Sequence, residues 1–167
     1  LTGEAFFQVK KDESRQFTVN TGNLSVNVYG TSFNVKTYPE ETIKEVTVLE
    51  GIVGITISNK QQKKLERNEQ ATLDMASRRI YYATVDPTIV SAWKNDELTI
   101  ENKTMKEIVL YLERWFGVNI QTDPKLLDDQ RYTFKTKTES LKEMLEILKV
   151  LIPFNYEIYG KKVTLSK

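Results

Sequence analysis

The first half of the chain carries apolar residues at alternate positions, the spacing that one buried face of a β-sheet requires. This period of two extends from Glu4 to about Tyr82. The alternating residues are Phe17, Val19, Leu24, Val26, Val28, Phe33, Val35, Val46, Val48, Val53, Ile55 and Ile57. Glycines, which suit tight turns and bulges, punctuate the runs. The pattern predicts an all-β unit, a β-sandwich or β-roll.

Two features interrupt this pattern. Residues Asn59–Asn68 are polar and charged, and we interpret them as a solvated hairpin loop between strands. Pro87 ends the first half, because proline cannot donate the next ladder hydrogen bond and holds its predecessor extended. We place the boundary near Asp86, with one domain at residues 1–86 and a second at residues 92–167.

After this boundary the apolar spacing becomes helical. The first helical stripe consists of Met105, Ile108, Val109, Leu112 and Phe116. Asn102 or Thr104 can cap its N-terminus, and Gly117 stands where a left-handed C-terminal residue is expected. A second helix begins at Ser140, which can form a cap with Glu143 three residues on. Its stripe consists of Leu141, Met144, Leu145, Leu148 and Ile152.

Short alternating strands surround these helices. They are expected around Glu97–Ile100, Val118–Thr122, Tyr132–Thr136, Asn155–Tyr159 and Val163–Leu165. The element order therefore reads β-α-β, β-α-β-β. Since each helix is followed by a strand after a short connection, two βαβ units would pack both helices on one face of a small sheet. The second domain is predicted to be a compact α/β sandwich.

Composition removes most catalytic chemistry. The 167 residues are 40% hydrophobic and 28% charged, with 24 basic and 23 acidic residues giving a net charge of +1. Because the chain has no histidine and no cysteine, it cannot build the usual nucleophilic triads or the common zinc, haem and iron–sulfur sites. We expect no enzyme, metal, cofactor or small-molecule substrate, and the scattered charges indicate no nucleic-acid partner.

Targeting signals are also missing from the sequence. No stretch approaches the ~20 apolar residues that span a bilayer, and no signal peptide is recognisable. The sequence begins at Leu1 in a segment that already has the pattern of a secondary-structure element. We therefore expect a fragment of a longer protein whose upstream part is not included. The lack of cysteine leaves the compartment open.

Four short motifs follow one another in the first half: GEAFFQV at residues 3–9, GTSFNV at 30–35, LEGIVGI at 49–55 and RNEQATL at 67–73. Their order and spacing resemble the periplasmic β-domain of FecR-family anti-sigma factors. The remainder, opening with AWKNDELTIENKTMKEIVLYLERWFGVNI, is similar to the family's carboxy-terminal domain. That domain is itself similar to the secretin and TonB short N-terminal fold.

The resemblance implies a periplasmic receiver within a single-pass inner-membrane protein. In such systems a TonB-dependent outer-membrane receptor presents a signalling domain to the carboxy-terminal part of the FecR-like protein. The signal then reaches an extracytoplasmic-function sigma factor through the membrane helix and a cytoplasmic segment. Neither of those parts, nor the family's first β-strands, is present here, so we expect an N-terminally truncated β-domain with an exposed edge.

The candidate partner-binding residues are Tyr111, Trp115, Ile147, Leu151, Val163 and Leu165. Tyr111 and Trp115 are an aromatic pair at i and i+4 beside the first apolar stripe. Ile147 and Leu151 continue the apolar surface around the second helix, where either the β-domain or a partner covers them. The terminal strand is expected to be a sheet edge to which a partner adds a strand. Trp93 matches the family's hinge tryptophan, and we expect it to pack between the domains.

Two other classes of function are considered. A carbohydrate-binding or scaffold module of the cell envelope is the alternative, although a sugar platform needs several aromatics on one exposed face. A glycoside hydrolase needs two carboxylates across a cleft. The pairs at Glu40-Glu41, Asp96-Glu97 and Asp128-Asp129 read instead as solvated turn residues.

Overall fold

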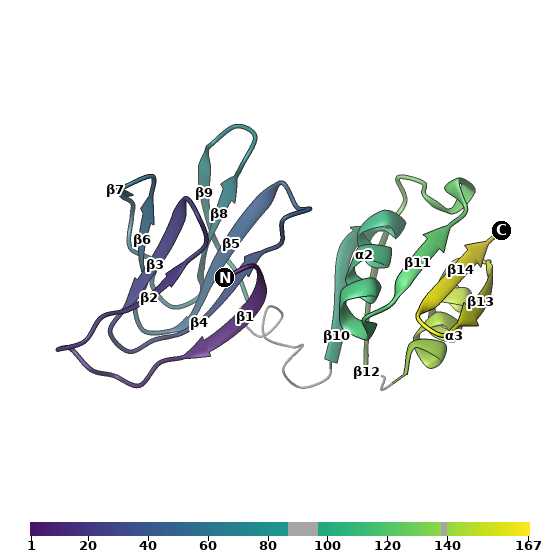
Figure 1. The fold of residues 1–167 in the computed structure, drawn as a ribbon, viewed down its shortest axis with the longest axis horizontal. Coiled ribbons are helices and arrows are strands. Elements are labelled where there is room, and N and C mark those ends of the chain that lie inside the picture. Colours follow the sequence, from purple (N-terminus) through teal and green to yellow (C-terminus); the bar gives the residue numbers. More distant parts are fainter. Residues whose placement is uncertain (87–96, 138–139) are drawn as a thin grey trace. The chain divides into compact units, whose positions relative to one another are not determined.

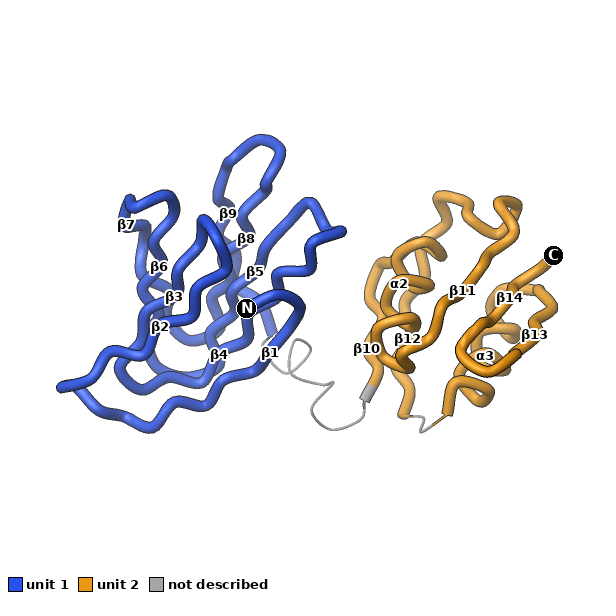
Figure 2. Tube along the Cα trace, in the orientation of Figure 1, with its two compact units in different colours: residues 1–91 blue, residues 92–167 orange. Residues whose placement is uncertain are grey.

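A computed structural model of the chain describes residues 1–86, 97–137 and 140–167 (Figure 1). The chain divides into two compact units, residues 1–91 (unit 1) and residues 92–167 (unit 2), which Figure 2 shows in blue and orange. Each unit has its own cluster of buried apolar residues. The two cores share no residue.

Unit 1 is a β-sandwich of two antiparallel sheets, as the alternating pattern predicts (Figure 1). The five-stranded sheet, in spatial order, consists of β1 (Gly3–Gln8), β4 (Ser32–Thr37), β5 (Ile43–Glu50), β8 (Glu69–Asp74) and β9 (Ile80–Thr84). The four-stranded sheet consists of β2 (Phe17–Asn20), β3 (Leu24–Val28), β6 (Gly54–Ile57) and β7 (Lys60–Gln61).

The core of unit 1 lies between these sheets. Phe33 and Val48 face each other across β4 and β5, and Val26 faces Ile55 across β3 and β6. All four side chains are essentially inaccessible to solvent. Burying an apolar side chain of this size contributes roughly 1.5–3 kcal/mol. Burial of these alternating apolar side chains therefore holds the two sheets together.

The segment at residues 59–68 differs from the expected solvated loop. Lys60–Gln61 form β7, and Leu65 is fully buried in the core of unit 1. The backbones of Leu65 and Val53 exchange two hydrogen bonds, each 2.9 Å long. The interpretation as a purely solvated loop is wrong, because one apolar residue within a polar run gives no periodicity from which burial can be inferred.

Unit 2 is the predicted small α/β unit, but its strands form two sheets where one was expected. The antiparallel pair consists of β10 (Glu97–Thr104) and β12 (Arg131–Lys137). The three-stranded sheet has the order β11 (Asn119–Thr122), β14 (Lys162–Ser166) and β13 (Asn155–Tyr159). Helices α2 (Met105–Phe116) and α3 (Leu141–Leu151) and the 3₁₀ helix η2 (Pro124–Leu126) complete the unit.

The division into two sheets follows from how the strands around α2 pair. β10 pairs with β12, whereas β11 pairs in parallel with β14, so the strands before and after α2 lie in different sheets. Both sheets and both helices contribute to one core, for example through Leu98, Ile120, Leu112 and Leu148. A helix with a wide apolar face can be covered from more than one direction in this arrangement.

The helix boundaries agree with the sequence signals. Thr104 is the N-cap of α2 and forms a complete capping box with Glu107: Thr104 N–H donates to Glu107 Oε2 over 2.8 Å, and Thr104 Oγ1 accepts from Glu107 N–H. Gly117 ends the helix with a φ of +62°, in the left-handed region that favours glycine. Ser140 Oγ accepts from Glu143 N–H over 3.2 Å at the start of α3.

Candidate partner-binding surface

The last strand of the chain is not a sheet edge. β14 is the middle strand of the three-stranded sheet, parallel to β11 on one side and antiparallel to β13 on the other. Val163 and Leu165 are each 1% exposed and belong to the core of unit 2. The expectation that this strand offers an edge is wrong, because a terminal position in sequence does not fix a strand's position in its sheet. These two side chains are core residues.

One outer margin of this sheet is occupied by a side chain. In β11, Asn119 N–H donates to Lys161 O over 2.8 Å, and Asp123 N–H donates to Leu165 O over 2.9 Å. Ile120 lies between them, so its N–H points away from β14. That group donates to Glu113 Oε1, at the end of α2, over 2.7 Å. The outer edge of β11 is therefore hydrogen-bonded to α2, the helix that precedes it.

The other outer margin belongs to β13, which is anchored to α3 by Tyr156. The Tyr156 hydroxyl donates to Glu146 Oε1 over 2.7 Å, and Lys149 Nζ lies 5.5 Å from the centre of the Tyr156 ring. The hydrogen bond to Glu146 raises the pKa of Tyr156. Beyond Tyr156, Ile158 and Tyr159 are exposed to 40% and 88%.

Of the predicted anchor residues, three lie half-buried against the core of unit 2. Tyr111 and Trp115 stack with ring centres 5.8 Å apart and planes inclined by 20°, and Ile147 packs on the same core. Leu151 differs, since it is exposed beside Val150 at the end of α3. Trp93 lies outside the described residues.

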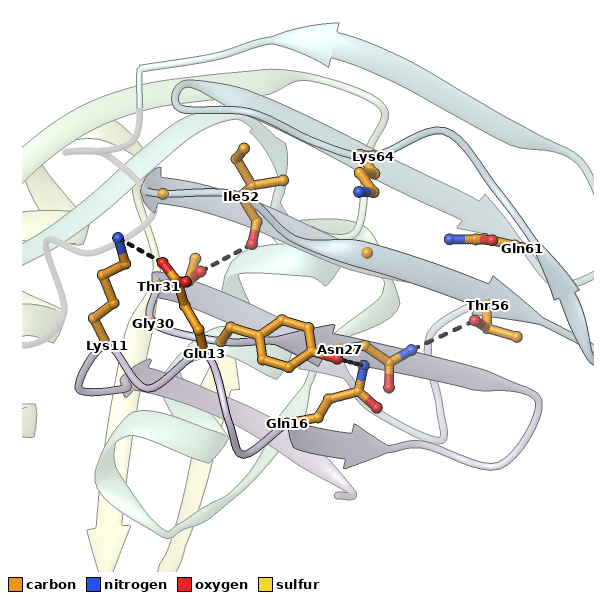
Figure 3. A pocket seen from close by; sticks show the side chains of 13 residues that line it. Lys11, Glu13, Gln16, Asn27, Gly30, Thr31, Ile52, Thr56, Gln61 and Lys64 are labelled. Atoms are coloured by element: carbon orange, nitrogen blue, oxygen red, sulfur yellow. Dashed lines mark hydrogen bonds and ion pairs between the residues drawn. The ribbon is translucent and has the colours of Figure 1, made fainter.

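A groove of about 660 Å³ lies in unit 1, on the outer face of the four-stranded sheet (Figure 3). Thr18 Oγ1 donates to Asn27 Oδ1 over 2.9 Å, and Asn27 Nδ2 donates to Thr56 Oγ1 over 3.4 Å, forming a polar row across the strands. Tyr29, whose hydroxyl accepts from Gln16 Nε2 over 3.2 Å, is the one aromatic residue among the described residues that line the groove.

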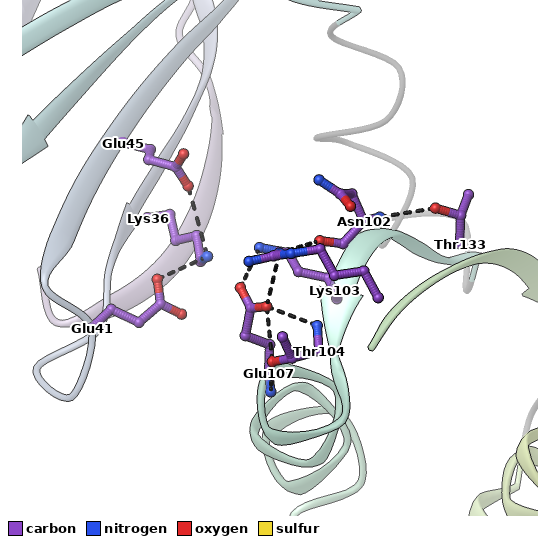
Figure 4. Close-up of polar contacts among 9 residues, drawn as sticks. Lys36, Glu41, Glu45, Asn102, Lys103, Thr104, Glu107 and Thr133 are labelled. Carbon is purple, nitrogen blue, oxygen red and sulfur yellow. Dashed lines mark hydrogen bonds and ion pairs between the residues drawn. The ribbon is translucent and has the colours of Figure 1, made fainter. Parts of the chain in front are cut away.

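A second polar arrangement lies on the five-stranded sheet of unit 1. Lys36 Nζ lies 2.9 Å from Glu41 Oε2 and 3.7 Å from Glu45 Oε2 (Figure 4). Burial alone would lower the pKa of Lys36, but the hydrogen bond and charge of Glu41 and the charge of Glu45 outweigh it and raise that pKa. The lysine is therefore a fixed positive charge in this cluster.

Glu4 on β1 adjoins this cluster. Its Oε1 accepts a hydrogen bond from Asn34 Nδ2 over 2.8 Å. Burial raises the pKa of the Glu4 carboxyl, and the bond from Asn34 and the charge of Lys36 only partly oppose this. Among the described residues, no group of three or more acidic, histidine or cysteine side chains could hold a metal ion.

A capping network of charged groups lies in unit 2, where Glu107 accepts from Thr104 and from Lys103 Nζ, the latter over 3.1 Å (Figure 4). Burial raises the pKa of Glu107, but these hydrogen bonds and the charge of Lys103 outweigh it, so the pKa is lowered. The network fixes the start of α2. In the part of the chain that the structure describes, no helix is long and apolar enough to cross a membrane.

Comparisons with known proteins agree with this architecture. The family model described as FecR protein matches residues 1–54, and the model described as FecR, C-terminal matches residues 97–165. Two crystal structures of a protein from Parabacteroides distasonis ATCC 8503, described as an anti-sigma factor, are similar to this chain. Each is 29% identical with a TM-score of 0.83, and the match covers 99% of this chain and 78% of that one. No curated protein matches the sequence.

The two folds and the two family matches define a signal-transducing region of an anti-sigma factor, a regulatory kind of protein. The chain belongs to the FecR family, with the β-sandwich in the position of the FecR domain and unit 2 in that of the FecR C-terminal domain.

Proposed function

We propose that this chain is the periplasmic receiver of a FecR-type anti-sigma factor, which binds the signalling domain of a TonB-dependent outer-membrane receptor. The observation that carries the proposal is that one chain holds both family domains, each over its own compact unit.

The signal is relayed inward by parts of the longer protein that lie outside this chain. That protein crosses the inner membrane once and contacts an extracytoplasmic-function sigma factor through a cytoplasmic segment. Receptor binding to the periplasmic region changes how that segment holds the sigma factor. The family membership supports this relay, since an anti-sigma factor acts on a sigma factor.

The apolar end of α3 contributes to the receptor contact. Leu151 and Val150 are exposed there, next to Ile147, which is half-buried. Exposed aliphatic residues beside a packed core give a partner apolar surface to bury. Tyr111 and Trp115 stack on each other in the same unit, half-buried against its core.

The proposal is tested by calorimetric titration of the whole chain with the signalling domain of the TonB-dependent receptor encoded beside its gene. A saturable complex of one to one stoichiometry is expected, with a dissociation constant of about 1 μM, which corresponds to roughly −8 kcal/mol. A sigma-dependent reporter should respond to the receptor's substrate only when the full-length protein is intact. Absence of binding at 100 μM of each protein would overturn the proposal.

A further inference from the structure

We propose that the receptor's signalling domain docks by adding a β-strand to the free margin of β13. The inference rests on the proposed function and specifies where and how the partner binds. A strand at the edge of a sheet carries unpaired backbone N–H and C=O groups and is a template for strand addition.

The register of the β13–β14 hairpin identifies these groups. Tyr159 and Lys162 flank the two-residue turn at Gly160 and Lys161, so they form a hydrogen-bonded pair. The backbone N–H and C=O groups of successive residues in a strand point to opposite sides. Those of Glu157 therefore point toward β14, and those of Tyr156 and Ile158 point away from it. Among the described residues, no hydrogen bond uses the N–H groups of Tyr156 or Ile158.

The other margins of the two sheets in unit 2 are less suited to strand addition. The β11 margin is occupied by the Glu113 carboxylate. β10 is bulged between Ile100 and Lys103, and Asn102 N–H donates to Thr133 Oγ1 over 2.9 Å. Along β12 the exposed side chains include Arg131, Lys135 and Lys137, and charged residues blunt an edge.

The side chains of β13 indicate the chemistry of the incoming strand. Ile158 faces the core side, opposite the fully buried Val163, yet it is 40% exposed because its outer flank is uncovered. An apolar side chain on the added strand would cover it. Glu157, on the opposite face, takes part in no ion pair among the described residues. The partner strand should therefore be apolar on one face and carry lysine or arginine opposite Glu157.

The negative charge of Glu157 also disfavours pairing of β13 with a second copy of this chain. In an antiparallel pair centred on Glu157, the two Glu157 side chains would lie directly opposite each other, and like charges in that position are destabilising. Tyr156 is already fixed to α3 by Glu146, so β13 needs no rearrangement to accept a strand. The occupant of this edge is therefore a basic-apolar strand of another protein.

The test compares two proline substitutions in β13. Ile158→Pro removes an outward N–H, which an edge strand tolerates, so the melting temperature should stay within about 2 °C of wild type. Glu157→Pro removes an inward N–H that pairs with β14, so unit 2 should be clearly destabilised. This pair of variants checks the register before any partner is added.

Titration with the receptor's signalling domain then tests the docking itself. Wild type should bind, and Ile158→Pro should bind at least tenfold more weakly, as should Glu157→Lys, which reverses the charge without changing the backbone. If wild type does not bind, the proposed function fails. If wild type binds and both variants bind as tightly as wild type, the docking inference is overturned and the proposed function stands. The docking inference is also overturned if the chain alone forms a dimer that Ile158→Pro abolishes. In that case wild-type binding alone decides whether the proposed function stands.

Discussion

The Glu113 carboxylate accepts a hydrogen bond from the backbone N–H of Ile120 over 2.7 Å. Glu113 lies in the last turn of α2, and Ile120 lies in β11. The backbone carbonyl of Glu113 also accepts from the N–H groups of Gly117 and Val118 at the helix end. One residue therefore terminates the helix, fixes the turn and bonds to the outer edge of β11, while β13 is the outer strand on the other side of that sheet.

Glu113→Ala is expected to destabilise unit 2 by about 1.5–3 kcal/mol, because it leaves the Ile120 N–H without its charged acceptor. Urea unfolding followed by circular dichroism measures the change. Glu113→Gln, which keeps an acceptor oxygen, should recover part of the loss. Glu157→Ala is the matched control, since that exposed residue should change the free energy of unfolding by no more than about 0.5 kcal/mol. Equal effects at both positions would contradict the role given to Glu113.

Leu65→Ala is expected to destabilise unit 1 by about 2–5 kcal/mol, since it leaves a cavity at a fully buried position. The control is Ile52→Ala, because Ile52 is 54% exposed and its truncation should cost far less. Thermal melting of both variants separates them. A small loss for Leu65→Ala would mean that residues 59–68 behave as a solvated loop after all.

Glu4 should make the stability of unit 1 depend on pH. Its pKa is raised above the ordinary value of 4.5, so the folded state holds this proton more tightly than the unfolded chain. The resulting stabilisation is complete below pH 4.5 and is lost as the pH rises through the folded pKa. Glu4→Gln should therefore raise the melting temperature at pH 7, with a smaller gain at pH 4, measured by calorimetry. An equal gain at both pH values, or the same gain for the exposed control Glu50→Gln, would contradict the assignment.

Glu107 should have the opposite dependence in unit 2. Its pKa is lowered from 4.5, so its stabilisation is present above pH 4.5 and is lost as the pH falls through the folded pKa. Thr104→Ala, which removes the cap, should cost about 1 kcal/mol at pH 7. Glu107→Gln should destabilise at pH 7 and have less effect near pH 3. Identical losses at both pH values would show that the charge of Glu107 plays no part.

Local signals in the sequence were sufficient to predict the helices. Thr104 and Ser140 cap their helices within three residues, and Gly117 adopts the left-handed conformation at the end of α2. These interactions join residues close in sequence, so spacing and residue type determine them. The alternation in residues 4–82 likewise predicted the all-β unit, because which face of a strand is buried depends on a period of two.

The candidate site was predicted less completely. The last strand was expected to be a sheet edge, but β14 lies between two strands, and the outer strand on one side is β13, which contains the exposed Ile158. Tyr111, Trp115 and Ile147 were expected to be anchors, and they lie half-buried against the core. Their helical positions were correct, while their exposure depended on neighbours from other elements.

By itself, the sequence of this protein determined the two fold classes, the helix boundaries and the absence of histidine and cysteine chemistry. Only the tertiary structure decided the order of strands in each sheet, the burial of Leu65 and the bond between Glu113 and Ile120. The physical reason is that caps and periodicity arise from neighbours along the chain. Strand order and burial instead depend on which distant segments meet, and the alternating pattern of one strand is compatible with many partners.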